Sequence, residues 1–443
     1  KINGVKCFLL PKPFTHWVKQ RSKNMMTYTQ LPFQYLSSNN SFKLTSFAGL
    51  PLYMELANKC GLWSEIIKRL HSKVRGWTDL QIVMSLIMLN LAGGDCVDDI
   101  ERLESDEGLS TILLKIETHG MKHRERRNYE KRWRKSKQRA FPSTAVIHRY
   151  LLQFHNEPEE QNRSIKTAFI PAPNKLMQKL LSINSALIDY SQQNNPHEIA
   201  TLDQDATLST THKNTALYCY KKYKAYQPFN TYWAEQGLLV HSEFRDGNVP
   251  AGFEQLRLLE ESLQQLPAGV KKAYLRSDSA GYQEKLLRYC AEGKDERFGI
   301  IEFAVAAKIS QGFKRAVLEV NSDKWQPIYK GEGDQKIKTE QEWTEVCYVP
   351  DWAIKRKDAP NYRYIAIRER MNKQLQLDGL ELAESAQPIQ RELPFQTIQL
   401  DQSEYKLFSI VTNRTLPGNE LINWHRARCG YSEKVHSVEK GDL

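Results

Sequence analysis

The spacing of apolar residues changes near residue 197, and this change constrains the fold more than any other feature of the sequence. Before it, apolar residues recur every three or four positions, as in PLYMELANKCGLWSEIIKRL and VDDIERLESDEGL. After it, apolar and polar residues alternate in short segments such as IATLDQDATLS. The first spacing indicates helices and the second indicates strands. The sequence therefore predicts a mostly helical region followed by a region built on a β-sheet.

Start and stop residues place three helices in the first region. Thr78 and Asp79 predict an N-cap before LQIVMSLIMLNLAGG, and Ser143 predicts one before the helix of residues 142–154. Gly108 is expected to close the short helix of VDDIERLESDEGL.

The second region alternates strands with helices. The expected order is a strand, a two-stranded hairpin, the helix GFEQLRLLEESLQQL, a strand, the helix QEKLLRYCAEGK and another strand. This order predicts a mixed α/β sheet with helices packed on it. Between residues 309 and 400, RAVLEV, EWTEVCYV and YRYIAIRER read as short strands of a β-rich insertion. The sheet resumes at 405–414, and a helix follows the LPGN turn.

Five parts are therefore expected along the chain. Residues 1–48 are a polar lead-in, partly non-native or disordered, because the chain begins with Lys1 whereas Met25 and Met26 are natural starts. The other four parts are a helical DNA-binding region (49–190), the first part of the α/β core (191–308), the insertion (309–400) and the last core strand with its helix (401–443).

An excess of positive charge points to a polyanionic partner, most often nucleic acid. The formal net charge is +11 and the isoelectric point is about 9.1. Most of the excess lies in KHRERRNYEKRWRKSKQR, residues 122–139, which we expect to be a solvated loop that neutralises DNA phosphates. Its candidate DNA-binding side chains are Lys122, Arg124, Arg126, Arg127, Lys131, Arg132, Arg134, Lys135, Lys137 and Arg139.

Two further segments are weaker candidates for DNA contact. The helix of 142–154 is either a recognition helix with His148 and Arg149 exposed or an ordinary packed helix. YCYKKYKAYQPF, residues 218–229, interleaves aromatic residues with Lys221, Lys222 and Lys224. It is an ordinary β-hairpin surface or, less favoured, a place where an unpaired base stacks.

The cysteines and apolar runs favour a reducing, cytoplasmic location. The seven cysteines form no C-x-x-C pair, so neither a disulfide framework nor a zinc ribbon is expected. IVMSLIMLNLAGG is too short to span a bilayer, and CFLLPKPF is too short for a signal peptide.

The acidic residues of the second region suggest a metal site. Asp203 and Asp205 share one face of a predicted strand, and Asp278 ends another strand just before a Ser-Ala-Gly turn. If the two strands are neighbours, their carboxylates and a third from the late helix form a site for two Mg²⁺ ions. Structural roles are the alternatives to a metal site. A lone Asp at a strand end is usually a cap, and an edge strand tolerates two acids.

Several segments resemble blocks of bacterial insertion-sequence DDE transposases. LDQDAT, YLRSDSAGY and YSEKVHSVEKGDL are similar to the catalytic blocks of the insertion sequence thirteen-eighty family. SFAGLPLYMELANKCGL and GGDCVDDIERLESDEGL resemble the N-terminal region of the same family. The resemblance runs from about residue 30 to the end, and it implies a ribonuclease-H-like catalytic domain.

The resemblance also implies roles for particular residues. Asp205, Asp278 and Glu433 become the catalytic acids that bind two Mg²⁺ or Mn²⁺ ions, with Asp203 on the same face as a further metal candidate. Lys440, two helical turns after Glu433, becomes the residue that holds a DNA phosphate. The partners implied are double-stranded DNA (terminal inverted repeats and target), bound by a homodimer in the bacterial nucleoid.

The late helix departs from the related pattern Y-x2-R-x3-E-x6-K. Glu433 and Lys440 match its second half, but Arg426 and Cys429 stand at the Tyr and Arg positions, and Arg428 is one residue away. We include Arg428 among the DNA-binding candidates. Because the chain stops soon after Lys440, we also expect a truncated product.

Three function classes follow. The favoured one is a transposase that cleaves DNA with water and transfers the freed 3′-OH to target DNA. The second is an inactive or domesticated relative that occupies transposon ends as a repressor. The third is a glycosidase using a carboxylate pair, which the basic charge disfavours.

Overall fold

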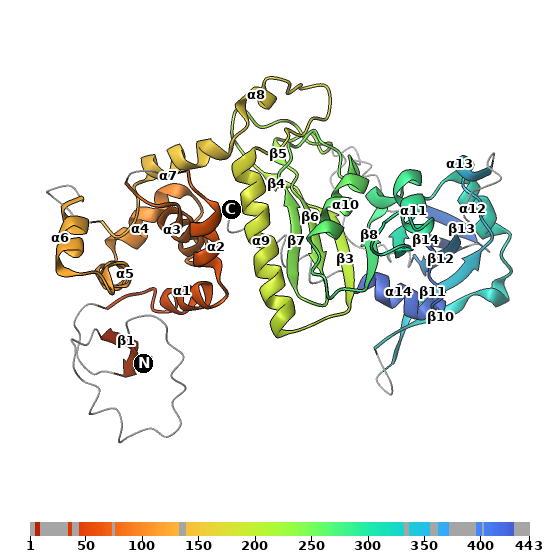
Figure 1. Cartoon of the computed structure of the whole chain (residues 1–443). Coiled ribbons are helices and arrows are strands. Elements are labelled where there is room, and N and C mark those ends of the chain that lie inside the picture. Colours follow the sequence, from red (N-terminus) through yellow and green to blue (C-terminus); the bar gives the residue numbers. More distant parts are fainter. Residues whose placement is uncertain are drawn as a thin grey trace, which may run out of the picture. The chain divides into compact units, whose positions relative to one another are not determined.

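The computed structural model describes residues 5–8, 34–37, 44–72, 76–132, 139–331, 336–354, 362–371, 396–400 and 403–428. Contacts divide the chain into two compact units, residues 1–194 with 437–443 and residues 195–436. The change in apolar spacing near residue 197 thus falls at the boundary between the two units. Figure 1 labels the elements of each unit.

The described part of the first unit is mainly helical. Its longer helices are α1 (Leu50–Lys59), α2 (Leu62–Arg69), α3 (Asp79–Leu91), α4 (Ile100–Ser105), α5 (Glu107–Thr118), α6 (His123–Arg132), α7 (Thr144–Leu151) and α9 (Lys175–Asn194), with one short turn, α8 (Glu157–Glu160). Two short strands, β1 (Val5–Phe8) and β2 (Gln34–Ser37), pair antiparallel where no strand was predicted.

The predicted helix starts are confirmed, and one predicted helix end is wrong. Thr78 and Gln81 form a reciprocal capping box at the start of α3, and Ser143 stands at the N-cap of α7. Gly108 does not close α4 but lies in the first turn of α5. A Cβ there would lie 2.8 Å from the backbone oxygen of Leu44, so glycine permits a close approach of two segments.

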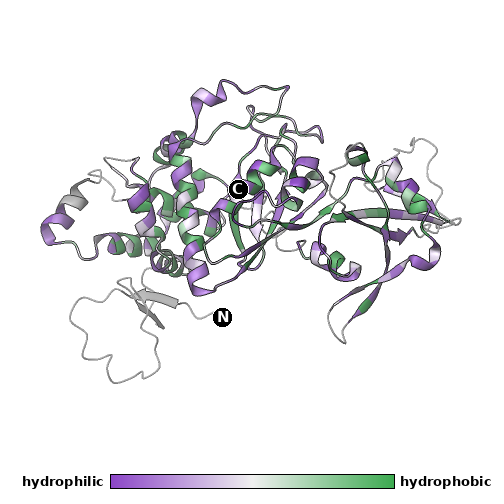
Figure 2. Cartoon of the chain, turned by 45° about the vertical axis from the view of Figure 1, so that its right-hand side comes forward, coloured by the Kyte–Doolittle hydropathy of each residue, from purple (hydrophilic) through white to green (hydrophobic). Residues whose placement is uncertain are grey.

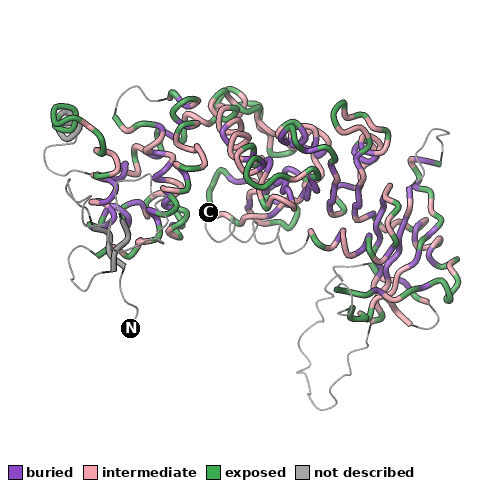
Figure 3. The backbone as a smooth tube through the Cα atoms, turned by 60° about the horizontal axis from the view of Figure 1, so that its bottom comes forward, coloured by how far each residue is buried: buried purple, intermediate pink, exposed green. Residues whose placement is uncertain are grey.

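Apolar side chains of several helices form the core of the first unit. Ile82 of α3, Ile100 of α4 and Ile112 of α5 are buried together with Phe141. Figure 3 shows the buried stretches in purple along these helices. Such burial stabilises a side chain by about 1.5–3 kcal/mol relative to an exposed one. The periodic apolar stripe is therefore what packs these helices together.

The second unit is built on a mixed sheet. Its strands are β3 (Ile199–Ala206), β6 (Phe229–Trp233), β7 (Leu238–Glu243), β8 (Lys272–Ser277), β9 (Glu302–Ala306), β10 (Gln326–Lys330), β11 (Ile337–Val346), β12 (Arg363–Arg370), β13 (Gln396–Leu400) and β14 (Ser403–Thr412). They are ordered β10-β11-β12-β14-β9-β8-β3-β6-β7, with β13 also paired to β14. β3, β8 and β9 run parallel, and the other pairs are antiparallel.

The insertion predicted for 309–400 joins this same sheet. β10, β11 and β12 extend it beyond β14, through antiparallel pairs. The first four residues of RAVLEV, predicted as a strand, belong instead to helix α12 (Gln311–Leu318). The hydroxyl of Ser310 caps that helix by accepting from the backbone N–H of Phe313, at 3.1 Å. Buried Phe313 and Val317, four residues apart, give the helix its packed face.

Helices lie on both faces of the sheet. Successive side chains of β3 point to opposite faces of the sheet. Asp203 faces α14 (Gly418–Arg426), because its partner Arg276 also binds the backbone of that helix. Gln204 faces α10 (Gln255–Gln265) and accepts from Gln255. α11 (Glu284–Ala291) follows β8 and contacts both β9 and α10. The strands between them show apolar green segments in Figure 2. Among the described helices, none has the length and apolar character needed to cross a membrane.

Candidate functional site

Two aspartates lie at the carboxyl ends of neighbouring parallel strands. Gln204 of β3 pairs with Ser277 of β8, so Asp205 and Asp278 directly follow a paired position. Asp278 caps the Ser-Ala-Gly turn, and its Oδ1 accepts from the backbone N–H of Ala280 at 3.0 Å. The expectation that the two strands are neighbours is confirmed. This edge is where α/β sheets commonly present functional groups.

The carboxyl group of Asp205 lies in a largely buried position close to one cation and a second carboxyl group. Burial raises its pKa to about 6, Arg428 opposes the shift, and the nearby charge of Asp278 adds to it. Arg428 Nη1 lies 3.6 Å from Asp205 Oδ2. A positive charge bound beside a buried carboxyl group favours its ionised form. Hard cations prefer such oxygen donors, so Asp205 and Asp278 fit a divalent metal ion.

Asp203 has a different partner. Its oxygens accept from Nε and Nη2 of Arg276 at 2.5 and 2.7 Å, and both side chains are almost fully buried. The remaining nitrogen of Arg276, Nη1, donates to the backbone oxygen of Trp424 at 2.7 Å. Bidentate pairing of this kind fixes orientation as well as charge. Asp203 and Arg276 therefore tie β3 and β8 to helix α14.

Two more contacts fasten the end of α14. The His425 Nε2 lies 3.1 Å from the backbone oxygen of Ser277, and burial lowers the pKa of His425 to about 3. The guanidinium of Arg414 lies 4.2 Å from the ring centroids of both Tyr274 and Trp424. The guanidinium of Arg276 lies 5.3 Å from the same Trp424 ring, so this side chain packs between two cations. These contacts hold α14 one turn before Arg428.

The opposite face of the sheet supports the turn that carries Asp278. Gln255 Nε2 donates to Ser277 Oγ at 2.9 Å and to Gln204 Oε1 at 3.2 Å, and all three residues are buried. A Cβ on Gly281 would lie 2.7 Å from Ser277 Oγ. Sequence reasoning missed Gln255. The signal was a glutamine in the same helical stripe as Leu258, Leu259 and Ser262.

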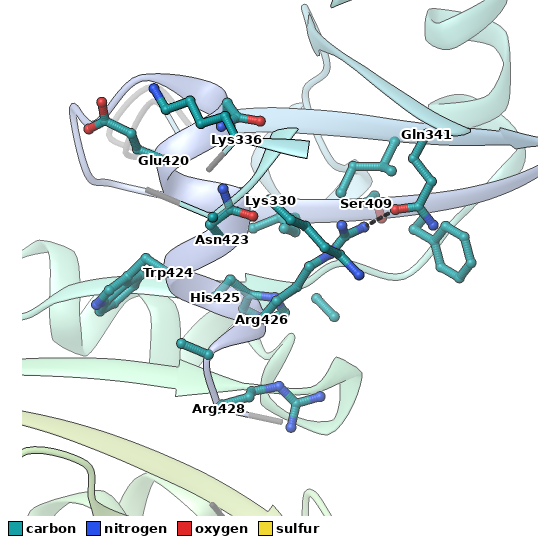
Figure 4. Close-up of a pocket in the computed structure, with 17 residues that line it drawn as sticks. Lys330, Lys336, Gln341, Ser409, Glu420, Asn423, Trp424, His425, Arg426 and Arg428 are labelled. Carbon is teal, nitrogen blue, oxygen red and sulfur yellow. Dashed lines mark hydrogen bonds between the residues drawn. The ribbon is translucent and has the colours of Figure 1, made fainter. Parts of the chain in front are cut away.

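A groove runs along the last turn of α14 on the insertion side (Figure 4). Its volume is about 1350 Å³, and its charged lining residues are Lys330, Lys336, Glu420, Arg426 and Arg428. Arg426 Nη2 donates to Gln341 Oε1 at 2.7 Å. Of the four cations, sequence reasoning named only Arg428 as a DNA-binding candidate. Lys330 is the last residue of β10 and Lys336 directly precedes β11, so no local pattern linked them to α14.

Several predicted residues fall outside the described part of the chain. Glu433 and Lys440 are among them, as are Arg134, Lys135 and Lys137. Lys131 and Arg132 lie in α6, but the placement of their side chains is likewise outside it. Within the described residues, no three His, Cys, Asp or Glu side chains form a group that would hold a metal ion. The roles of these residues stay predictions.

The basic segment contains a helix rather than the expected loop. Lys122, Arg124, Arg126 and Arg127 are exposed at the start of α6. Arg139, at the other end, binds Glu101 Oε1 at 2.6 Å and is less exposed. Neighbouring charges along a helix are compatible with helical structure when solvent surrounds them. The first turn of α6 therefore presents cations to a partner.

The remaining DNA candidates differ in exposure. His148 and Arg149 of α7 are exposed, as predicted. Lys221 and Lys222 are also exposed, whereas Lys224 Nζ donates to the backbone oxygen of Asn214 at 3.0 Å. Lys224 thus helps to hold its own loop.

Comparisons with known proteins add a family match. Residues 37–366 match the family model described as Transposase DDE domain group 1. One similar solved structure is the cryo-EM structure of the piggyBac transposase synaptic complex with hairpin DNA, with 10% identity and a TM-score of 0.38 over 88% of this chain and 68% of that chain. A TM-score of that size supports no conclusion about function. No curated protein sequence matches the chain.

Proposed function

This chain belongs to the family of transposases with a DDE domain of group 1, and from that premise we propose that it cleaves and transfers DNA at the ends of an insertion sequence of the thirteen-eighty type. The observation that carries the proposal is the position of Asp205 and Asp278 at the ends of two neighbouring parallel strands. The proposed catalytic domain is ribonuclease-H-like.

The proposed metal ligands are Asp205, Asp278 and Glu433, with Asp203 as the candidate that must first leave Arg276. Their oxygen atoms suit Mg²⁺ or Mn²⁺. A pair of such ions, when bound, activates the attacking oxygen and stabilises the leaving one. The fit is supported by the pKa of Asp205, which burial and the charge of Asp278 hold near 6.

The side chains around the ligands position them. Gln255 and Gly281 hold the turn of Asp278 from behind, and His425 ties the end of α14 to Ser277. Arg428 and Lys440 are proposed to bind the phosphate next to the bond that breaks. Water then attacks the phosphorus and releases a 3′-OH, which attacks target DNA in a second in-line displacement.

The proposed partner is double-stranded DNA, bound by a homodimer in a bacterial cytoplasm. Exposure at the start of α6 supports a phosphate-binding role for four residues: Lys122, Arg124, Arg126 and Arg127. Each phosphate that the protein neutralises releases counterions, so binding should weaken steeply with salt.

A nicking assay tests the proposal. A plasmid carrying the insertion-sequence ends is incubated with Mg²⁺ and the protein. We expect the wild type to nick it and Asp278→Ala to leave it intact. Asp323→Asn, an exposed acid in another turn, is the matched control and should nick normally. Tight binding of the ends without any nicking by the wild type would instead support the alternative, an end-binding repressor.

A further inference from the structure

A small lobe projects from the sheet edge that carries Asp205 and Asp278. Residues 207–228 connect the end of β3, at Ala206, to the start of β6. β6 is antiparallel to both β3 and β7, so β7 runs parallel to β3 and ends at the same edge. Residues 244–251 follow there. We call 207–228 and 244–251 together the aromatic lobe; its short strands β4 (Ser209–Thr210) and β5 (Ala225–Tyr226) are labelled in Figure 1.

The backbone of the aromatic lobe is fixed. Cys219 N–H donates to Tyr223 O and Lys222 N–H donates to Cys219 O, each at 2.9 Å, which closes a tight turn. A Cβ on Gly247 would lie 2.5 Å from Ala225 O and 2.7 Å from Leu217 O, so the second segment is pressed against the first. Side chains on such a backbone are presented in defined positions, which lowers the entropy cost of binding.

Three aromatic side chains of the lobe face solvent. Tyr218 is 64% exposed, Tyr220 72% and Phe244 63%, although aromatic residues usually bury most of their surface. Phe244 leans on Tyr226, with ring centroids 4.7 Å apart. Exposed rings on a rigid support are the arrangement that binds another flat, apolar group.

The lobe is also positively charged. Its charged residues, apart from His212, are Lys213, Lys221, Lys222, Lys224, Arg245 and Asp246. Arg245 Nε donates to Glu243 Oε1 of β7 at 2.8 Å, so the four lysines make up the excess of positive charge. Lys221 Nζ lies 5.8 Å from the ring centroid of Tyr220, so a cation and a ring are presented together. This charge favours a polyanion over an apolar protein surface.

We propose that the aromatic lobe is a stacking platform for unpaired bases of a DNA strand next to the cleavage site, an inference that rests on the proposed function. Tyr218 and Tyr220 stack on base faces, while Lys221 and Lys222 bind the phosphates between them. Bases in a duplex are already stacked, so the platform selects strands that have opened or been cut. Aromatic stacking is sequence-tolerant and contributes about 1–3 kcal/mol per base.

The test measures binding without catalysis. All variants are made in the full chain with Asp278→Asn and assayed in EDTA. The probe is a single-stranded oligonucleotide of mixed sequence carrying 2-aminopurine, compared with a blunt duplex of the same sequence. We expect Tyr218→Leu with Tyr220→Leu to weaken single-strand binding at least about tenfold, and to relieve 2-aminopurine quenching. Binding of the blunt duplex should stay within about twofold of the parent.

Two controls separate stacking from other effects. Tyr218→Phe with Tyr220→Phe keeps both rings and should bind the single strand like the parent. Tyr329→Leu removes an exposed ring from β10, the terminal strand of the sheet farthest from β7, and should leave single-strand binding unchanged. Equal Tm values check the fold of each variant.

Three results would overturn the proposal. One is unchanged single-strand binding by the double Leu variant, and another is an equal loss on the duplex. The third is a shift in sedimentation of the double Leu variant alone, which would make the lobe a contact between protein chains. A chain that binds the probe through its tyrosines but nicks no plasmid would contradict the proposed function and leave this inference standing.

Discussion

Asp205 lowers the stability of the metal-free protein at neutral pH. Its folded-state pKa of about 6 lies above the ordinary value of 3.8, so the folded state holds a proton that the unfolded chain has released. The stability that this proton contributes is fully present below pH 3.8 and is lost as pH rises through 6. We predict that Asp205→Asn, which cannot ionise, raises the free energy of unfolding by about 1–3 kcal/mol at about pH 7.5.

Urea unfolding in EDTA at about pH 4 and about pH 7.5 measures this effect. The gain should shrink toward zero at the lower pH, where the folded wild type is almost fully protonated at this site and the unfolded chain is protonated in part. A gain of equal size at both pH values would show that the substitution acts through packing and not through charge.

Asp203 and Asp278 should respond differently to substitution. Asp203→Asn leaves Arg276 buried without its counter-ion, so we expect a loss of about 3 kcal/mol in unfolding free energy. Mn²⁺ binding, followed by its electron paramagnetic resonance signal, should persist in Asp203→Asn and be abolished in Asp278→Asn. The double variant Asp203→Asn with Arg276→Met should recover part of the stability. Equal reduction of Mn²⁺ binding in both single variants would make Asp203 a ligand.

Helix α14 carries a histidine that should make stability sensitive to acid. The folded-state pKa of His425 is about 3, below the ordinary 6.5, because the side chain is buried. Below pH 6.5 the unfolded chain takes up a proton that the folded state refuses, so stability falls as pH drops toward 3. The slope from this group is about 1.4 kcal/mol per pH unit.

His425→Gln tests this prediction, because glutamine keeps a hydrogen-bond donor for Ser277 but does not titrate. Chemical unfolding between about pH 6.5 and about pH 4.5 should show a shallower fall in stability for the variant than for the wild type. Parallel curves would mean that His425 is protonated in the folded protein.

The first turn of α14 has no room for a side chain at Gly418. A Cβ there would lie 2.0 Å from the ring of Trp343, so the helix or the ring must move. We predict that Gly418→Ala lowers the unfolding free energy by about 1–3 kcal/mol. Gly312→Ala, in the first turn of α12 where the space is open to 3.5 Å, should be neutral or gain about 0.5–1 kcal/mol. Thermal unfolding of both variants makes the comparison, and similar losses would contradict it.

Elements with strong local patterns were predicted correctly from the sequence. β3, β8 and α10 follow their alternating or helical spacing, and the neighbouring positions of Asp205 and Asp278 follow from the strand order. RAVLEV failed because a serine cap and two apolar residues four apart outweigh the β propensity of its valines.

The contacts around the acids were less accessible to prediction. The pairing of Asp203 with Arg276 depends on strand register, and the support from Gln255 depends on the packing of α10, neither of which a local pattern specifies. Glu433 was placed by resemblance alone.

At the scale of the whole molecule, affinity for duplex DNA should depend on the basic helix α6. Replacing Lys122, Arg124, Arg126 and Arg127 with Gln removes four exposed cations. We predict that the slope of log K against log salt becomes shallower, by up to about 0.9 for each DNA phosphate that the variant no longer neutralises. Fluorescence anisotropy on a blunt duplex at several salt concentrations measures the slope. An unchanged slope would show that these residues do not bind DNA.

The β-rich insertion is structurally joined to the helix that leads toward Glu433. Ile328 of β10 shares a core with Leu421 and Ile422 of α14, and the side chain of Asn419 accepts from the backbone N–H of Tyr329 at 2.8 Å. The insertion therefore forms part of the support of α14, and changes in its length should not be tolerated at β10. A substitution in β10 that changes this packing should also move α14, so we expect compensating substitutions between β10 and α14 among related proteins.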